Sequence, residues 1–278
     1  KIMRGKHALP AVLLAATVLP GTADARVTGF QIQSASPAFE GAAFADTGTY
    51  ERIDAIATIA VDPDAPANAG IADLDKAPRN ARGEVEFTTE VFILRPADAA
   101  KQSPVLFYEV PNRGRNLSFT LLNRSAGTGV PAKAEEAGDG FLMNRGSTVV
   151  WSGWQFDAPE AGINITLPKL PGVTGMSREQ MIFDKPGETG KIPLTYPAAD
   201  LDPSKARLTV RATADDAPAA PEGLTFKYVS STEIEITRPA GLDSGAIYDF
   251  VYPAEGAVPA GLALAATRDV VSFLRGND

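Results

Sequence analysis

A short polar turn after an apolar run is the first part of the sequence that suggests chemistry. Asn112, Arg113 and Gly114 follow the apolar run 104–110 after a single proline, Pro111. In open α/β sheets, ligands bind at the carboxyl ends of strands, and a turn with glycine can direct backbone N–H groups at a developing oxyanion. We therefore take these three residues as candidates for an oxyanion loop. A plain turn, with Gly114 supplying a positive φ, is the alternative.

Two tryptophans, the only ones in the chain, lie at the end of a second apolar run, 147–152. Indole rings often line pockets for aromatic or sugar rings. Because Trp151 lies inside the run, we favour core packing for it. Trp154 and its neighbour Gln155 lie beyond the run, and they are the ligand-binding candidates of the sequence, with packing as the open alternative for Trp154.

The residue types that serve most catalytic sites are missing. The sequence has no cysteine and a single histidine, His7, which excludes disulfide scaffolds, cysteine nucleophiles and thiolate zinc sites. If His7 is removed with a signal segment, the mature chain cannot form a Ser-His-Asp triad. The Gly-x-Ser-x-Gly turn of serine hydrolases does not occur either. The acidic pairs 135–136 and 215–216 are typical of solvated turns, and we expect no metal and no organic cofactor.

The first 25 residues have the three parts of a secretory signal. Three basic residues accompany the start of an apolar stretch, 8–19, which is too short to cross a bilayer, and Ala23-Asp24-Ala25 fits the small-x-small cleavage rule. We therefore predict cleavage after Ala25 and export to the periplasm or the medium. A buried N-terminal helix is the alternative.

Composition and net charge restrict the classes of partner that the protein is expected to bind. The chain of 278 residues is 44 % hydrophobic and 22 % charged, as in ordinary globular proteins, and its formal net charge is −8. No run after the signal approaches the ~18 apolar residues of a membrane helix. An acidic protein repels phosphate backbones. We therefore expect a small-molecule partner, no nucleic acid and no membrane span.

Hydrophobic periodicity predicts most of the secondary structure. Alternation predicts strands over 28–33, 50–61, 84–94, 207–212, 224–229 and 232–238. The runs 104–110 and 147–152 are apolar on both faces, which is typical of parallel strands covered by helices. The connection between them is long enough for a crossover helix, placed at 132–145, so the pair is a predicted βαβ unit. A single apolar stripe predicts a helix over 261–275.

Three stretches together resemble the bacterial alpha/beta hydrolase domain family of exported proteins. They are FYEVPNRGRN (107–116), STVVWSGWQFD (147–157) and GAIYDFVYPAEGAVPAGLALAATRDVVSFLR (245–275). The resemblance implies an α/β fold class: a partial alpha/beta-hydrolase sheet with an N-terminal β-rich region and an inserted antiparallel β patch. It further implies that the last helix leads to a nucleophile, an acid and a histidine beyond residue 278. In such folds the turn 112–114 lies where oxyanion donors are found.

These observations give a predicted organisation and two functions. The segments are a signal peptide (1–25), a β-rich region (26–95), a βαβ core (104–155), a loop and β insertion (156–240) and a helical end (245–278). The expected function is the N-terminal part of an exported serine hydrolase acting on an ester or related acyl bond, inactive by itself. The alternative is a non-catalytic secreted binding module for a carbohydrate or aromatic ligand.

Overall fold

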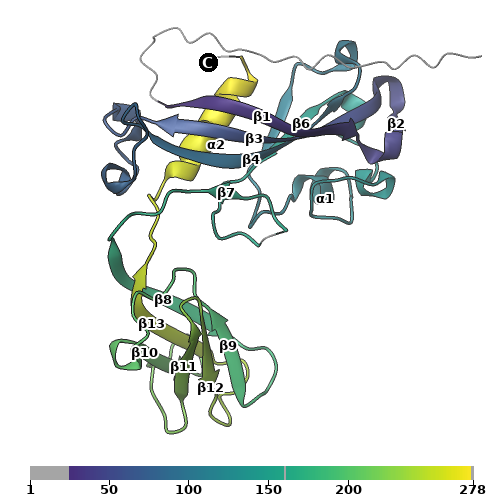
Figure 1. Ribbon diagram of the computed structural model, residues 1–278. Coiled ribbons are helices and arrows are strands. Elements are labelled where there is room, and N and C mark those ends of the chain that lie inside the picture. Colours follow the sequence, from purple (N-terminus) through teal and green to yellow (C-terminus); the bar gives the residue numbers. More distant parts are fainter. Residues whose placement is uncertain (1–24, 160, 277–278) are drawn as a thin grey trace, which may run out of the picture.

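The chain folds into two lobes joined by two stretches of backbone (Figure 1). The computed structural model describes residues 25–159 and 161–276. The first lobe contains one large sheet and both α-helices, and the second lobe contains two three-stranded sheets. The predicted signal peptide lies outside the described residues except for its last residue, Ala25. No helix in the described part of the chain is long and apolar enough to cross a membrane.

The elements follow one another in a simple order. The strands of the first lobe are β1 (Ala25–Pro37), β2 (Ala43–Phe44), β3 (Gly48–Val61), β4 (Val85–Pro96), β5 (Leu106–Glu109), β6 (Thr148–Ser152) and β7 (Ile165–Thr166). Its α-helices are α1 (Ser118–Leu122) and α2 (Leu262–Leu274). The strands of the second lobe are β8 (Thr174–Ile182), β9 (Thr189–Pro193), β10 (Arg207–Arg211), β11 (Thr225–Ser230), β12 (Glu233–Thr237) and β13 (Ile247–Glu255). Short 3-10 helices span Phe39–Gly41, Ala45–Thr47, Pro66–Asn68, Leu74–Lys76, Ala99–Lys101, Ala134–Ala137, Met143–Arg145 and Pro203–Lys205.

The large sheet has the strand order β1-β3-β4-β6-β5, with β2 beside β3 and β7 beside β4. Neighbouring strands are antiparallel except β5 and β6, which are parallel as predicted. Alternation along β3 and β4 places one set of apolar side chains on a single face: Ile53, Ala55, Ala57, Ile59, Val61, Val85, Phe87, Val91 and Ile93. The apolar stripe of α2 packs on this face through Leu262, Ala265, Ala266 and Val270. The predicted helix over 261–275 is therefore confirmed.

A second cluster of buried aromatic residues fills the other face at one end of this sheet. Trp151 of β6 is fully buried, and its ring centroid lies 5.3 Å from that of Phe119 on α1. Phe39 stacks on Phe119 from the other side at 6.4 Å. Core packing, the interpretation favoured for Trp151 from the sequence, is confirmed.

The second lobe has a core of its own. Its two sheets have the orders β10-β13-β8 and β11-β12-β9, and the residues buried between them all come from this lobe: Ile192, Leu194, Ala198, Leu208, Val210, Ile234, Ile236, Ala246, Tyr248, Phe250, Tyr252 and Ala254. The strands predicted over 207–212, 224–229 and 232–238 correspond to β10 and to the β11–β12 hairpin. The sequence patterns did not predict the strands β8, β9 and β13.

The predicted fold class is wrong. The chain is mostly β-sheet, with 38 % strand, 17 % helix and two α-helices among the described residues, and it does not have an α/β-hydrolase fold. A sheet of that class carries helices on both faces, whereas the large sheet here has one long helix on one face. The strand β5 also differs from expectation, because it lies at the sheet edge and its four residues are only half-buried.

The predicted crossover helix over 132–145 is wrong as well. This segment contains two short 3-10 helices instead. Gly138, Gly140 and Gly146 have φ values of 60°, 71° and 69°, which a right-handed helix does not allow. A Cβ atom at Gly138 would lie 1.9 Å from the backbone oxygen of Asn123. Glycine is therefore required where the apolar spacing had indicated a helix.

Separate cores predict separate responses to a core mutation. Phe250 is fully buried between Phe226 and Tyr252, at centroid distances of 4.9 and 5.2 Å. Phe250→Ala should cost the second lobe about 3–5 kcal/mol. Hydrogen exchange followed by mass spectrometry should show lost protection in β8–β13 and unchanged protection in β3 and β4. Phe87→Ala, in the first-lobe core, should show the opposite pattern. Equal loss of protection in both lobes after either substitution would contradict the independence of the two cores.

Candidate functional site

A pocket of about 380 Å³ opens where the two lobes meet. Three parts of the first lobe line most of it: the loop 154–157, Leu167 after β7, and the segment 258–264 that begins α2. Tyr196 is the lining residue from the second lobe. The volume is in the range of pockets that hold small organic ligands, which runs from about 300 to 1,000 Å³.

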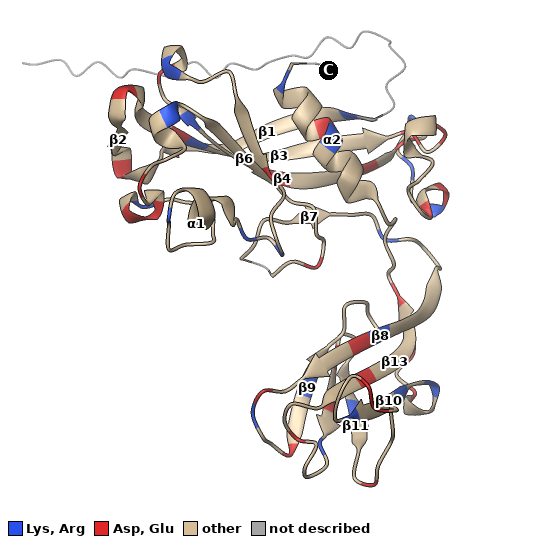
Figure 2. Cartoon of the chain, turned by 180° about the vertical axis from the view of Figure 1, so that it is seen from behind, with Lys and Arg blue, Asp and Glu red and all other residues tan. Residues whose placement is uncertain are grey.

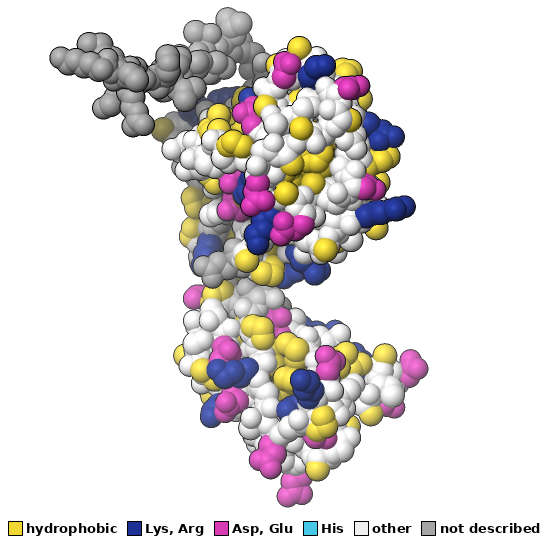
Figure 3. All heavy atoms as spheres, turned by 90° about the vertical axis from the view of Figure 1, so that its right-hand side faces the viewer, with side chains coloured by type: hydrophobic (Ala, Val, Ile, Leu, Met, Phe, Trp, Pro, Cys, Tyr) yellow, Lys and Arg dark blue, Asp and Glu magenta, His cyan; other side chains and the backbone are white. Residues whose placement is uncertain are grey.

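The pocket wall is mainly apolar and aromatic. Its apolar and aromatic members are Trp154, Phe156, Leu167, Tyr196, Val258, Pro259, Ala260, Ala263 and Leu264. Phe156 is 36 % exposed and Leu264 is 67 % exposed, so solvent reaches this surface. In Figure 3, hydrophobic side chains are visible at the narrow part between the lobes, while charges of both signs are dispersed over each lobe, as they are in the rear view of Figure 2. The pocket therefore offers apolar contact surface to a ligand.

Trp154 is held at this wall by its backbone and by its indole. The preceding residue, Gly153, donates its N–H to Glu90 O at 3.0 Å and accepts from Thr89 Oγ1 at 2.8 Å. A Cβ atom at Gly153 would lie 1.9 Å from Asn164 O, so glycine is required where the chain leaves β6. The Trp154 Nε1 donates to Pro111 O at 2.6 Å. The indole N–H is thus satisfied by protein.

The structure brings the predicted oxyanion loop next to the predicted ligand-binding residues. The Arg113 N–H donates to Gln155 Oε1 at 2.7 Å, and the Asn112 N–H donates to Arg115 O at 2.9 Å. Gly114 has a φ of 74°, and a Cβ there would lie 2.8 Å from Gly162 Cα. Two backbone donors of the loop are therefore occupied by groups of the chain itself.

An ion pair fixes the rim between these two segments. Arg113 Nη1 lies 2.6 Å from Asp157 Oδ2, and Arg113 Nη2 donates to Asp157 O at 2.7 Å. Across the pocket, burial raises the pKa of Tyr196, and the nearby carboxylates of Asp157 and Glu179 raise it further. The Tyr196 hydroxyl is therefore neutral at physiological pH.

Tyr196 is in turn anchored on the second lobe by a buried phenol. Tyr252 is fully buried, and its Oη donates to Tyr196 O at 2.8 Å. Burial raises the pKa of Tyr252 to about 12, although a hydrogen bond with Ser177 acts to lower it. The segment that carries Tyr196 depends on a tyrosine that must stay protonated.

A half-buried carboxylate behind the loop 112–114 was missed by the sequence analysis. Glu109, the last residue of β5, accepts from Trp151 Nε1 at 2.6 Å and from the backbone N–H groups of Leu117 and Ser118. Its second oxygen also accepts a short hydrogen bond from Ser118 Oγ. These bonds tie β5, β6 and α1 together just before the loop. An ionisable residue inside the apolar run 104–110 was the available signal, because such residues are buried only with partners.

Metal ligands do not gather in the described part of the chain. Among residues 25–159 and 161–276, no group of three or more His, Cys, Asp or Glu side chains is close enough to hold a metal ion. The only histidine, His7, lies outside these residues.

Comparisons of the chain with protein-family models, with curated proteins and with solved structures found no match. The resemblance to the hydrolase family therefore stays a prediction. Function has to be argued from the geometry of the site, since a fold by itself does not assign one.

Glu109→Gln tests the role of this half-buried carboxylate. The substitution keeps the shape but replaces one acceptor oxygen by an NH₂ group, which leaves a buried donor such as the Trp151 N–H unpaired. We expect a loss of about 1–3 kcal/mol in the free energy of unfolding, measured by urea denaturation. Glu51→Gln is the matched control. It breaks an ion pair with Arg95 near the surface and should cost less than about 1 kcal/mol. Equal effects of the two variants would contradict the role of Glu109.

The stability of the second lobe at alkaline pH tests whether the buried Tyr252 supports the segment that carries Tyr196. The ordinary pKa of tyrosine is about 10, so a folded-state pKa of about 12 means that neutral Tyr252 stabilises the fold. That stabilisation, about 2–3 kcal/mol, is complete below pH ~10 and is lost as the pH rises from ~10 to ~12. Tyr252→Phe should flatten this decline in second-lobe stability, followed by hydrogen exchange against pH. If second-lobe stability falls with pH as steeply in Tyr252→Phe as in the parent, the decline does not come from Tyr252.

Proposed function

We propose that the chain is a binding module that holds a small, largely apolar molecule with an aromatic or ester-like group in the pocket between its lobes. The observation that carries this proposal is the wall of aromatic and aliphatic side chains around a pocket of about 380 Å³. Burying apolar ligand surface against such a wall is favourable by roughly 25 cal/mol per Å². The predicted ligand-binding residues, Trp154 and Gln155, are part of this wall.

The state of the polar groups favours an aromatic ligand over a carbohydrate. A sugar presents many hydroxyls, and a site that binds one must offer matching donors and acceptors. Here the Trp154 N–H is bonded to Pro111 O, and the Gln155 carbonyl oxygen accepts from Arg113. The carboxylate of Asp157 is paired with Arg113. With these groups already used within the chain, apolar contact is the main interaction that remains.

One observation favours a second candidate, in which the same pocket is the substrate site of an exported ester hydrolase. The Arg113 N–H already binds an amide oxygen, Gln155 Oε1, at 2.7 Å. The carbonyl oxygen of an ester is the same kind of acceptor, so the loop 112–114 is chemically suited to one. The described residues contain no histidine, so in this candidate the nucleophile and base come from outside them. This chain alone should therefore not hydrolyse 4-nitrophenyl butyrate above a protein-free control.

Binding of a neutral aromatic probe tests the proposed function. N-phenyl-1-naphthylamine should bind the full chain with a fluorescence increase that saturates. Trp154→Ala removes a large part of the wall and should weaken binding about 10-fold, which corresponds to 1.4 kcal/mol. Trp154→Phe should fall between this variant and the parent.

A control and a competitor complete this experiment. Phe141→Ala removes an exposed aromatic residue that does not line the pocket and should leave the affinity unchanged. We expect 4-nitrophenyl butyrate to displace the probe and cellobiose to leave it bound. Saturable binding that Trp154→Ala does not alter would contradict the proposal.

A further inference from the structure

We propose that the second lobe is a movable wall of this pocket, with Tyr196 as its ligand contact, and that a bound ligand holds the two lobes at one angle. The inference rests on the proposed function of the pocket. It adds a second-lobe binding residue and a conformational response that binding alone does not require. Four observations carry it.

Tyr196 moves with the second lobe because its segment is tied to that lobe at several points. Its carbonyl oxygen accepts from the buried Tyr252 Oη at 2.8 Å. On either side, the Thr195 N–H donates to Glu179 Oε1 at 2.7 Å and the Ala198 N–H donates to Ser231 O at 2.7 Å. The phenol therefore projects from a rigid support.

The opposite wall is equally fixed to the first lobe. Trp154 bonds to Pro111, and Gln155 and Asp157 both bond to Arg113. The third wall segment, 258–264, continues into α2, whose apolar stripe is buried on the large sheet. The two sides of the pocket are therefore two rigid bodies.

Little apolar contact joins these bodies. The hydrophobic clusters of the first lobe contain none of the second-lobe core residues, and the second-lobe cluster contains none from the first. Among the described residues, the aromatic contact between the lobes is that of Phe156 with Tyr196, whose ring centroids are 5.8 Å apart at 37°. Both rings line the pocket. An interface of this kind leaves relative domain motion as the default expectation.

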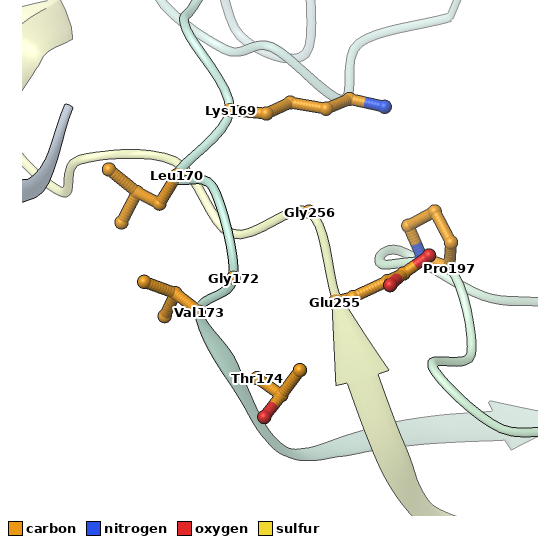
Figure 4. A pocket seen from close by; sticks show the side chains of 8 residues that line it. All are labelled: Lys169, Leu170, Gly172, Val173, Thr174, Pro197, Glu255 and Gly256. Atoms are coloured by element: carbon orange, nitrogen blue, oxygen red, sulfur yellow. The ribbon is translucent and has the colours of Figure 1, made fainter. Parts of the chain in front are cut away.

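The two stretches of backbone that connect the lobes form a hinge at which the angle between the lobes can change. They are held side by side where the Leu170 N–H donates to Ala257 O at 2.7 Å. Just beyond this bond, Gly172 and Gly256 have φ values of 67° and 73°. A hollow of about 240 Å³ lies at this point, with Lys169 and Pro197 on its two sides (Figure 4). Leu170, Val173 and Ala257 themselves pack on the first-lobe core, so a change of angle here must leave them in place.

The width of the pocket is therefore set by the angle between the lobes. A planar molecule inserted between Phe156 and Tyr196 would part their ring centroids beyond the present 5.8 Å, contact both bodies at once and replace the single ring contact by two. Such a ligand binds best at the one lobe angle that lets both rings stack on it, and this difference in affinity narrows the population to that angle.

Distance measurements between the lobes test this inference. The chain has no cysteine, so Gln33→Cys with Glu222→Cys places one spin label on an exposed position of each lobe. Without a ligand we expect a broad distance distribution by double electron–electron resonance. Saturating N-phenyl-1-naphthylamine should narrow and shift it. Tyr196→Ala should abolish the shift and weaken probe binding about 5- to 10-fold, and Tyr196→Phe should restore both.

The outcomes separate the two proposals. If the probe binds in a way that depends on Trp154, but the distribution is unchanged and Tyr196→Ala binds like the parent, the movable wall is wrong and the binding function stands. If the probe does not bind the full chain at all, the proposed function fails and this inference fails with it. Phe141→Ala in the labelled chain should behave like the parent in both measurements.

Discussion

Burial of α2 on the alternating apolar face of β1, β3 and β4 is the interaction on which the rest of the structure depends. The helix comes last in the described chain, after the whole second lobe. Its docking through Leu262, Ala266 and Val270 completes the first-lobe core. It also forces the chain to return beside the stretch by which it left. The start of α2 becomes a wall of the pocket for this reason, and the pocket lies at the lobe junction for the same reason.

Internal satisfaction of polar groups gives the pocket its chemical character. Around the loop 112–114, the Arg113 N–H is paired with Gln155 Oε1, the Arg113 guanidinium with Asp157 and the Trp154 N–H with Pro111 O. Behind it, Glu109 organises β5, β6 and α1 through hydrogen bonds from buried donors. These bonds make the loop rigid and leave apolar contact as the main interaction that a ligand can make with it. A site of this kind selects for shape and apolar area more than for hydrogen-bonding pattern.

The parts of the fold that the sequence predicted are those with strong local periodicity. The strands β3 and β4 and the helix α2 each bury one face, so their patterns were clear. The strand β8 was missed because its side chains are exposed or only half-buried, which leaves no apolar alternation to detect. The strand β13 carries Pro253 within an aromatic run, which argues against a strand in isolation. Fold class failed because apolar runs at 104–110 and 147–152 do not reveal that β5 is an edge strand.

The same distinction applies to the site. Trp154, Gln155 and the loop 112–114 were identified because each follows an apolar run, and the structure places them in contact. Tyr196, Phe156 and the segment 258–264 carried no sequence signal for ligand binding, because only the return of the chain from the second lobe brings them together. Residues that meet through the arrangement of two lobes are not visible in local patterns.

A crystal structure of the full chain grown with N-phenyl-1-naphthylamine is the most direct test of the account. We predict density for the aromatic rings of the probe in the pocket at the lobe junction, with Trp154 and Phe156 on one side and Tyr196 on the other. An ordered probe bound elsewhere, with this pocket empty or filled by water, would contradict the central claim.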